Sequence, residues 1–207
     1  MNIALINGSP KKKDSASEII LSELKSLLGN NNINEISLNS PKLENPENFS
    51  GHDILVFSFP LYIDGIPSHL LSCLCELEQY FRQNPSDTMV YAMSNNGFFE
   101  GEQNKYAIEL MKNWCIKSGL KWGGGLGVGA GGMLGGLKDV PAGKGPKKNI
   151  SLAINKLSEN ILNKKENGIK FVSPNLPRFM YILVAHMGFR QAIKVNGFKT
   201  KDLFRKK

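Results

Sequence analysis

The densest set of potential anion-binding groups lies in residues 7–17, NGSPKKKDSAS, which follow the apolar run MNIALI. Ser9, Ser15 and Ser17 supply hydroxyl groups, and three consecutive lysines supply positive charge. Hydroxyls, ammonium groups and the free N–H groups at a helix start all bind phosphate oxygens. The sequence SASE at residues 15–18 is also a capping box, which starts a helix without any ligand. A phosphate site and a plain helix start therefore both remain open.

Two further loops carry side chains suited to a planar ligand. Residues 60–67, PLYIDGIP, contain Tyr62, whose flat ring can stack on an aromatic system. Residues 94–103, SNNGFFEGEQ, contain the amides of Asn95 and Asn96, which can bond a polar ring edge. Asparagine and glycine are also common in ordinary turns, so neither loop is specific by itself.

The common nucleotide-binding motifs do not occur at the first loop. The chain has no G-x-x-x-x-G-K-[ST] sequence, and the first strand is not followed by G-x-G-x-x-G. Residues 127–132 match the second string, but they lead into more glycine-rich sequence instead of a helix. The phosphate of a mononucleotide therefore fits the first loop better than a dinucleotide does.

The hydrophobic pattern predicts alternating strands and helices that bring these loops together. Strands joined through helices run parallel and form an open α/β sheet. Ligands of such sheets bind beyond the carboxyl ends of the strands, which is where the three loops lie. The predicted strands cover residues 2–6, 33–38, 53–59, 88–94 and a glycine-rich fifth strand from 120, and the predicted helices cover 15–28, 66–81, 102–117 and 147–164.

The order of the three loops resembles the NAD(P)H-dependent FMN reductase and quinone reductase branch of the flavodoxin-like superfamily, over about residues 1–164. The resemblance implies a flavodoxin-like α/β fold: an open parallel five-stranded sheet in the order 2-1-3-4-5, with helices on both faces. It also implies noncovalent FMN. The chain departs from the family by placing serines and Asp14 where Gly, Asn and Thr are frequent. The phosphate contacts implied by the resemblance are Ser9, Lys11, Ser15, Ala16 and Ser17.

The resemblance further implies that the second and third loops hold the flavin ring and that NAD(P)H reduces it for a quinone or similar acceptor. A homodimer is implied as well. Two alternatives remain: an electron carrier of the flavodoxin type, and a flavin-free binding module on the same fold. No catalytic acid or base is assigned. The implied ring contacts are Pro60, Leu61, Tyr62, Ile63, Ser94, Asn95, Asn96, Gly97 and Phe98.

Charge and cysteine content argue against other classes of function. The net charge is +8, but residues 190–207 contribute +6 of it, so we expect no nucleic-acid partner. The three cysteines are too few for a disulfide framework and indicate reduced thiols in the cytoplasm. Cys73 and Cys75 lie two apart on a predicted helix and point in different directions, so we expect no metal site.

The sequence divides into a flavodoxin-like domain at residues 1–166 and a C-terminal helical extension at residues 167–207. The extension combines an apolar run at residues 179–189 with a basic tail. We expect it to pack on the body or on a second subunit, with a peripheral membrane site as the alternative. Residues 127–148 are rich in glycine and are predicted to lack regular structure, either as a mobile rim over the flavin or as a disordered segment.

Overall fold

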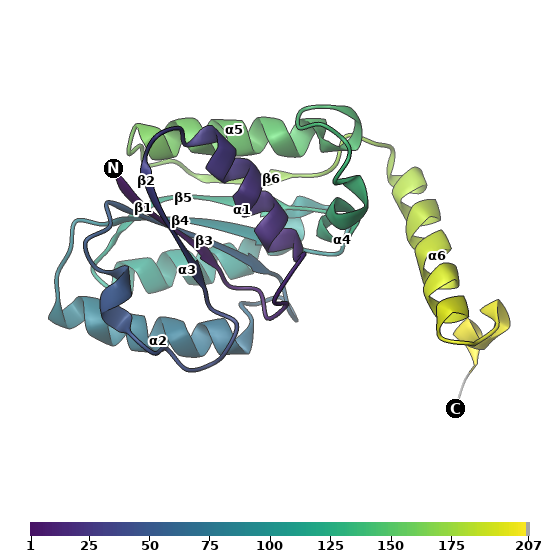
Figure 1. Cartoon of the computed structure of the whole chain (residues 1–207), viewed down its shortest axis with the longest axis horizontal. Helices are drawn as coiled ribbons and strands as arrows, with labels where there is room; N and C mark the ends of the chain where they lie inside the picture. Colours follow the sequence, from purple (N-terminus) through teal and green to yellow (C-terminus); the bar gives the residue numbers. More distant parts are fainter. Residues whose placement is uncertain (206–207) are drawn as a thin grey trace. The chain divides into compact units, whose positions relative to one another are not determined.

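The computed structural model describes residues 1–205 and divides into two compact units, Met1–Pro174 and Asn175–Lys207. The first unit is a single sheet with helices on both of its faces (Figure 1). The second unit consists of one long helix and a short 3₁₀ turn.

The sheet has six parallel strands in the order β2-β1-β3-β4-β5-β6. The expected order 2-1-3-4-5 is confirmed, but the expected count of five strands is corrected to six. The additional edge strand is β6, only four residues long and containing a lysine, so its sequence carries little strand pattern. The strands are β1 Asn2–Asn7, β2 Asn32–Ser37, β3 Ile54–Pro60, β4 Met89–Asn95, β5 Lys121–Val128 and β6 Ile169–Val172.

Helices α1 and α5 cover one face of the sheet, and α2 and α3 cover the other (Figure 1). The strand β3, buried along its length except at Pro60, shows why both faces need a cover. Its side chains alternate, so that Ile54 and Val56 join the core under α1 and α5 while Leu55 and Phe57 join the core under α2 and α3. The four helices are α1 Ala16–Leu27, α2 Ser68–Gln83, α3 Lys105–Lys117 and α5 Lys148–Leu162.

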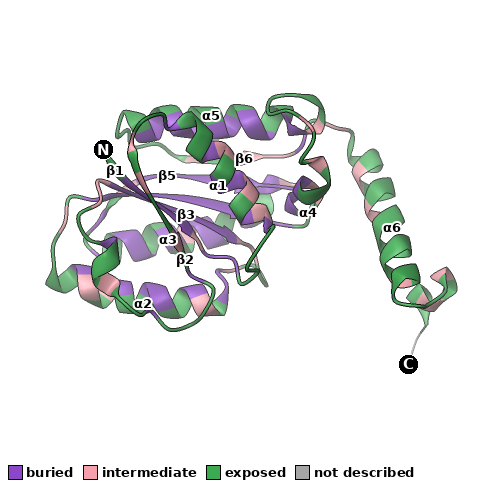
Figure 2. Cartoon of the chain, viewed as in Figure 1, coloured by how far each residue is buried: buried purple, intermediate pink, exposed green. Residues whose placement is uncertain are grey.

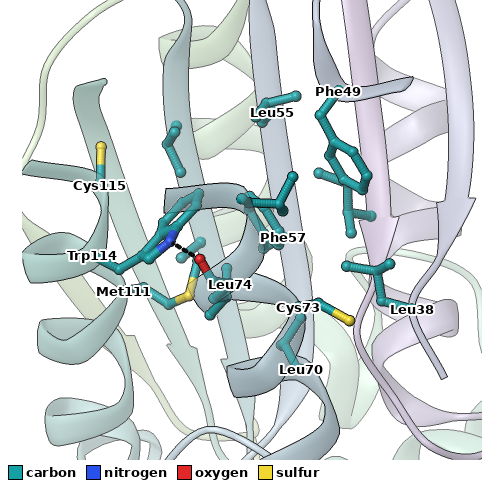
Figure 3. Close-up of a cluster of buried hydrophobic side chains, with 14 of the residues drawn as sticks. Leu38, Phe49, Leu55, Phe57, Leu70, Cys73, Leu74, Met111, Trp114 and Cys115 are labelled. Carbon is teal, nitrogen blue, oxygen red and sulfur yellow. Dashed lines mark hydrogen bonds between the residues drawn. The ribbon is translucent and has the colours of Figure 1, made fainter. Parts of the chain in front are cut away.

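The core beneath α2 and α3 is centred on aromatic side chains (Figure 3). The rings of Phe57 and Trp114 meet edge to face, with their centroids 5.4 Å apart. The indole Nε1 of Trp114 donates a hydrogen bond to the carbonyl of Leu74 at 2.7 Å, so this buried polar group has a partner. No α-helix connects β2 to β3; the connection contains only a 3₁₀ turn at Pro46–Phe49, whose Phe49 fills the same core.

Glycines in β5 and in the turn before α3 allow the backbone to pack unusually closely. A Cβ atom on Gly101 would lie 2.3 Å from the carbonyl oxygen of Val172 and 2.6 Å from that of Gly127. Such distances exclude any side chain. The glycine-rich sequence therefore lets the turn before α3 and the edge strand β6 both approach β5.

The glycine-rich segment after β5 is more ordered than the sequence predicts. It contains the short helix α4 (Gly131–Leu134) and two 3₁₀ turns, which corrects the expectation of no regular structure. Leu134 is 2% exposed and packs in the core under α1 and α5, so one apolar side chain anchors a run of glycines. Local sequence cannot reveal this anchor because its partners are distant in the chain.

The second unit is built around α6, which spans Arg178–Val195. Its chain then turns through a 3₁₀ segment at Thr200–Phe204. No residue of α6 is buried (Figure 2). Among the described residues, no helix has both the length and the apolar character needed to cross a membrane.

Candidate functional site

A cleft of about 330 Å³ opens where β1, β3 and β4 end. All three of the sequence-predicted loops contribute to its wall, together with the segment around α4. The cleft gathers eleven of the fourteen residues implied by the resemblance; their role in binding remains a prediction. The lining residues are Ser9, Lys11, Asp14, Ser15, Ala16, Ser17, Pro60, Leu61, Tyr62, Asn95, Asn96, Gly97, Gly131, Gly132 and Gly135.

The start of α1 forms part of the cleft wall. Ser15 is the N-cap, and its hydroxyl accepts a hydrogen bond from the backbone N–H of Glu18 at 3.1 Å. The N–H groups of Ala16 and Ser17, the first two residues of the helix, have no acceptor within the helix. Both residues line the cleft, so their N–H groups and the positive end of the helix dipole are available to an anion.

Three serine residues of the first loop line the cleft. Ser9, Ser15 and Ser17 are each no more than 4% exposed. The oxygen of each accepts one hydrogen bond: from the Lys11 N–H, the Glu18 N–H and the Asn95 side-chain amide, respectively. Within the described part of the chain, none of the three donates a hydrogen bond, so each retains its hydrogen for an acceptor in the cleft.

Asn95 holds the three cleft-forming elements together. Its Nδ2 donates to the Ser17 hydroxyl at 2.8 Å and to the carbonyl of Phe59 at 3.1 Å. The backbone carbonyl of Asn95 accepts a hydrogen bond from the backbone N–H of Leu61 at 2.7 Å. One buried amide at the end of β4 thus connects α1 with the end of β3. Asn95 therefore positions the cleft walls as well as lining them.

Asp14 is the one carboxylate in the lining, and its charge is neutralised from a distant part of the chain. Its side chain forms an ion pair with Lys138, which lies in the segment after α4. The hydrogen bond and the charge of Lys138 hold the pKa of Asp14 below its ordinary value of 3.8, with smaller contributions from Lys11 and Lys13. The Lys11 ammonium donates to the carbonyl of Asp14 at 2.9 Å, which keeps this cation in the loop.

We predict that Lys138→Met raises the pKa of Asp14 toward its ordinary value, because the largest source of the depression is removed. The pKa of Asp14 is lower in the folded state than in the unfolded state. The ion pair therefore adds to the free energy of unfolding at pH values above the unfolded-state pKa, and this contribution is lost as the pH falls through the folded-state pKa. An NMR titration of the Asp14 carboxyl carbon measures the change. Lys144→Met removes an exposed lysine of the same segment and serves as the control. Equal titration curves for the two variants would contradict the pairing.

A second ion pair fixes the segment after α4 to the body. The ammonium of Lys147 lies 3.6 Å from a carboxylate oxygen of Glu23 on α1, and both side chains are nearly buried. Lys147 also donates to the carbonyl of Val140 at 3.3 Å. The two pairs, at Asp14 and at Glu23, therefore hold residues 129–147 along the edge of the cleft.

The turn after β3 adds apolar groups to the wall of the cleft. Tyr62 and Gly65 exchange two backbone hydrogen bonds, which closes a tight turn. The two residues inside this turn, Ile63 and Asp64, have φ values of 47° and 56°. A left-handed conformation is costly for a branched side chain such as isoleucine. The turn presents the ring of Tyr62, half-exposed, to the cleft.

Three of the predicted residues lie outside the lining. The Ser94 hydroxyl donates to the side-chain oxygen of Asn104 at 3.0 Å and is fully buried. Ile63 points its side chain fully into solvent, and Phe98 is 59% exposed. Four lining residues were not among the predicted contacts: Asp14, Gly131, Gly132 and Gly135. The glycines carry no local signal for this position, since only the folding of residues 129–147 brings them to the cleft.

His69 has a structural place beside the cleft. Its Nε2 lies 3.2 Å from the carbonyl of Gly8 and 3.1 Å from that of Leu38, so it acts as an N–H donor to backbone. His69 is not part of the lining. Across residues 1–205, no cluster of three or more His, Cys, Asp or Glu side chains is arranged to hold a metal ion.

Comparison with known proteins places the fold. No protein-family profile matches the sequence, and no curated protein does either. Among solved structures, a flavone reductase superposes with a TM-score of 0.63 at 13% identity, over 81% of this chain and 66% of the other. A flavodoxin from Streptococcus pneumonia superposes with a TM-score of 0.56 at 11% identity, over 79% of this chain and 99% of the other. An NADPH-quinone reductase from P. pentosaceus superposes with a TM-score of 0.55 at 13% identity, over 76% of this chain and 98% of the other. The chain therefore has a flavodoxin-like fold.

Proposed function

We propose that this protein is an FMN-dependent oxidoreductase that takes electrons from NAD(P)H and delivers them to a quinone or similar acceptor. One observation carries the proposal: five hydrogen-bond donors and a cation line the same cleft as Pro60, Leu61 and the ring of Tyr62. FMN has a group for each set, with a phosphate at one end and an aromatic ring system at the other.

The phosphate end fits a phosphate group by its donor set. The N–H groups of Ala16 and Ser17 and the hydroxyls of Ser9, Ser15 and Ser17 all have hydrogens to donate, while Lys11 adds positive charge. The Asp14 carboxylate would repel a phosphate, and its pairing with Lys138 offsets that repulsion. The donors are fixed by the start of α1 and by Asn95, so little rearrangement is needed for binding.

The ring end would hold the flavin with apolar and backbone groups. Pro60 and Leu61 form its wall, the Tyr62 ring is exposed enough to stack, and Gly97 leaves room at the polar edge. FMN bound there supplies the redox chemistry, accepting a hydride and passing electrons on. Apart from Lys11 and Asp14, Tyr62 is the one titratable side chain of the lining. The protein therefore orients and shields the ring, and we assign no acid or base to it.

Anaerobic stopped-flow mixing tests the proposal. The protein is reconstituted with FMN, freed of excess flavin and mixed with NADPH or NADH while the flavin absorbance is followed. We expect the absorbance to bleach much faster than that of free FMN at the same concentration, because a bound nicotinamide is held against the ring.

Two results would contradict the proposal, and each favours one of the alternatives. Protein that retains FMN but is reduced by NAD(P)H no faster than free FMN, while dithionite reduces it fully, acts as an electron carrier. Protein that shows no flavin absorbance after incubation with FMN and gel filtration is a flavin-free binding module.

A further inference from the structure

The second unit concentrates exposed apolar side chains. Taken by itself, it carries eleven of the 22 large apolar side chains that are exposed in the described chain, although it has only 33 residues. Phe179, Leu183, Met187 and Phe189 on α6 are each more than half exposed. Apolar side chains gathered to this extent mark a surface that binds something.

The same unit carries nearly all of the net charge. It holds eight of the 26 lysines and arginines of the chain and one of the 18 carboxylates, a net charge of +7. The first unit holds the remaining 18 cations and 17 anions, a net charge of +1. The partner of the second unit must therefore tolerate both apolar side chains and a high positive charge.

The two kinds of side chain are arranged along α6. His186, Arg190 and Lys194 are spaced by four residues and form one polar line along its second half. The seven residues before His186 carry no charged side chain. Phe198 and Phe204 then alternate with the basic residues of the tail and are themselves exposed. Apolar groups thus lie beside cations in the second half of α6 and in the tail, while the first half of α6 is almost entirely apolar.

We propose that the second unit binds the surface of a membrane that contains anionic lipid. Apolar side chains enter the boundary between headgroups and acyl chains, while neighbouring lysines and arginines reach the anionic headgroups. No helix in the described part of the chain can cross the membrane, so the unit lies on it. This inference does not depend on the proposed redox activity.

Charge and chemistry separate this partner from the others. A second copy of the unit would bring another net charge of +7 against the first, and the first unit, with a net charge of +1, offers no net opposite charge. A nucleic acid would pair with the cations but would leave the phenylalanines and leucine of α6 in water. An anionic lipid surface satisfies both groups.

Sedimentation with lipid vesicles tests the proposal on the full-length protein. We expect the protein to sediment with vesicles that contain phosphatidylserine and to remain in the supernatant with pure phosphatidylcholine. Added salt should reduce the binding, since it screens the headgroup charge. Because each cation near such a surface contributes about fivefold, Arg190→Gln with Lys194→Gln should weaken the partition roughly 25-fold.

Apolar contact is tested separately. Phe179→Ser with Leu183→Ser should weaken binding about tenfold or more, because both exposed side chains lose their burial in lipid. Matched controls lie on α3 of the first unit: Lys112→Gln with Lys117→Gln removes the same charge, and Leu110→Ser removes an exposed leucine. The control variants should bind vesicles like the unmodified protein.

Several outcomes would overturn the proposal. Protein that stays in the supernatant with both vesicle types has another partner for the unit. If Phe179→Ser with Leu183→Ser instead changes the mass measured by light scattering and leaves sedimentation unaltered, the partner is a second copy. Binding to duplex DNA that is tighter than binding to phosphatidylserine vesicles, and indifferent to the two serine substitutions, would identify a nucleic-acid surface. If the α3 control variants weaken vesicle binding as much as the α6 variants do, the second unit is not the membrane-binding surface.

Discussion

We expect the combined variant Ser9→Ala and Ser17→Ala to weaken FMN binding by about 1–3 kcal/mol, at about 1 kcal/mol for each hydrogen bond lost. Both hydroxyls retain a hydrogen that no described residue of the protein accepts, and both serines line the cleft. Fluorescence titration with FMN measures the loss. Riboflavin lacks the phosphate, and its affinity should change little.

The comparison between the two ligands makes this test specific. The Ser17 hydroxyl also accepts a hydrogen bond from Asn95, so its removal costs some stability irrespective of phosphate. Such a general loss would weaken both ligands equally, and that result would reject the phosphate assignment. Ser22→Ala with Ser26→Ala removes two exposed hydroxyls from the same helix and should leave both affinities unchanged.

Replacing Phe57 by alanine should lower the free energy of unfolding of the first unit by about 3–5 kcal/mol. Its side chain is fully buried and packs edge to face on Trp114, so its removal leaves a cavity between β3 and the helices (Figure 3). Urea unfolding followed by tryptophan fluorescence measures the loss. Both tryptophans, Trp114 and Trp122, belong to the first unit, and the signal reports on that unit alone.

The matched control is Phe98→Ala, the same substitution at a side chain that is 59% exposed. It should change the free energy of unfolding by no more than about 0.5 kcal/mol, because little apolar surface is removed from the core. Phe57→Leu should cost less than about 1.5 kcal/mol, since a large apolar side chain remains. Similar losses for Phe57→Ala and Phe98→Ala would show that the core is not packed as described.

The sequence by itself determined the features that depend on short stretches of chain. The apolar run of β3 and the periodicity of α1 required a parallel sheet covered on both faces. The capping box at Ser15 marked the start of α1 to within one residue. Because parallel strands end at one edge, the positions of three loops in the sequence were enough to place them around one cleft.

The tertiary structure alone decided the features that depend on distant partners. The pairing of Asp14 with Lys138 joins residues 124 positions apart, and the anchoring of Leu134 depends on helices on either side of it in the sequence. The edge strand β6 gains its regular structure from pairing with β5 and has no strong pattern of its own. The hydrophobic pattern of a segment indicates which of its own side chains are buried. Contacts between distant segments form only when the whole sheet has brought them together, and those contacts complete the cleft.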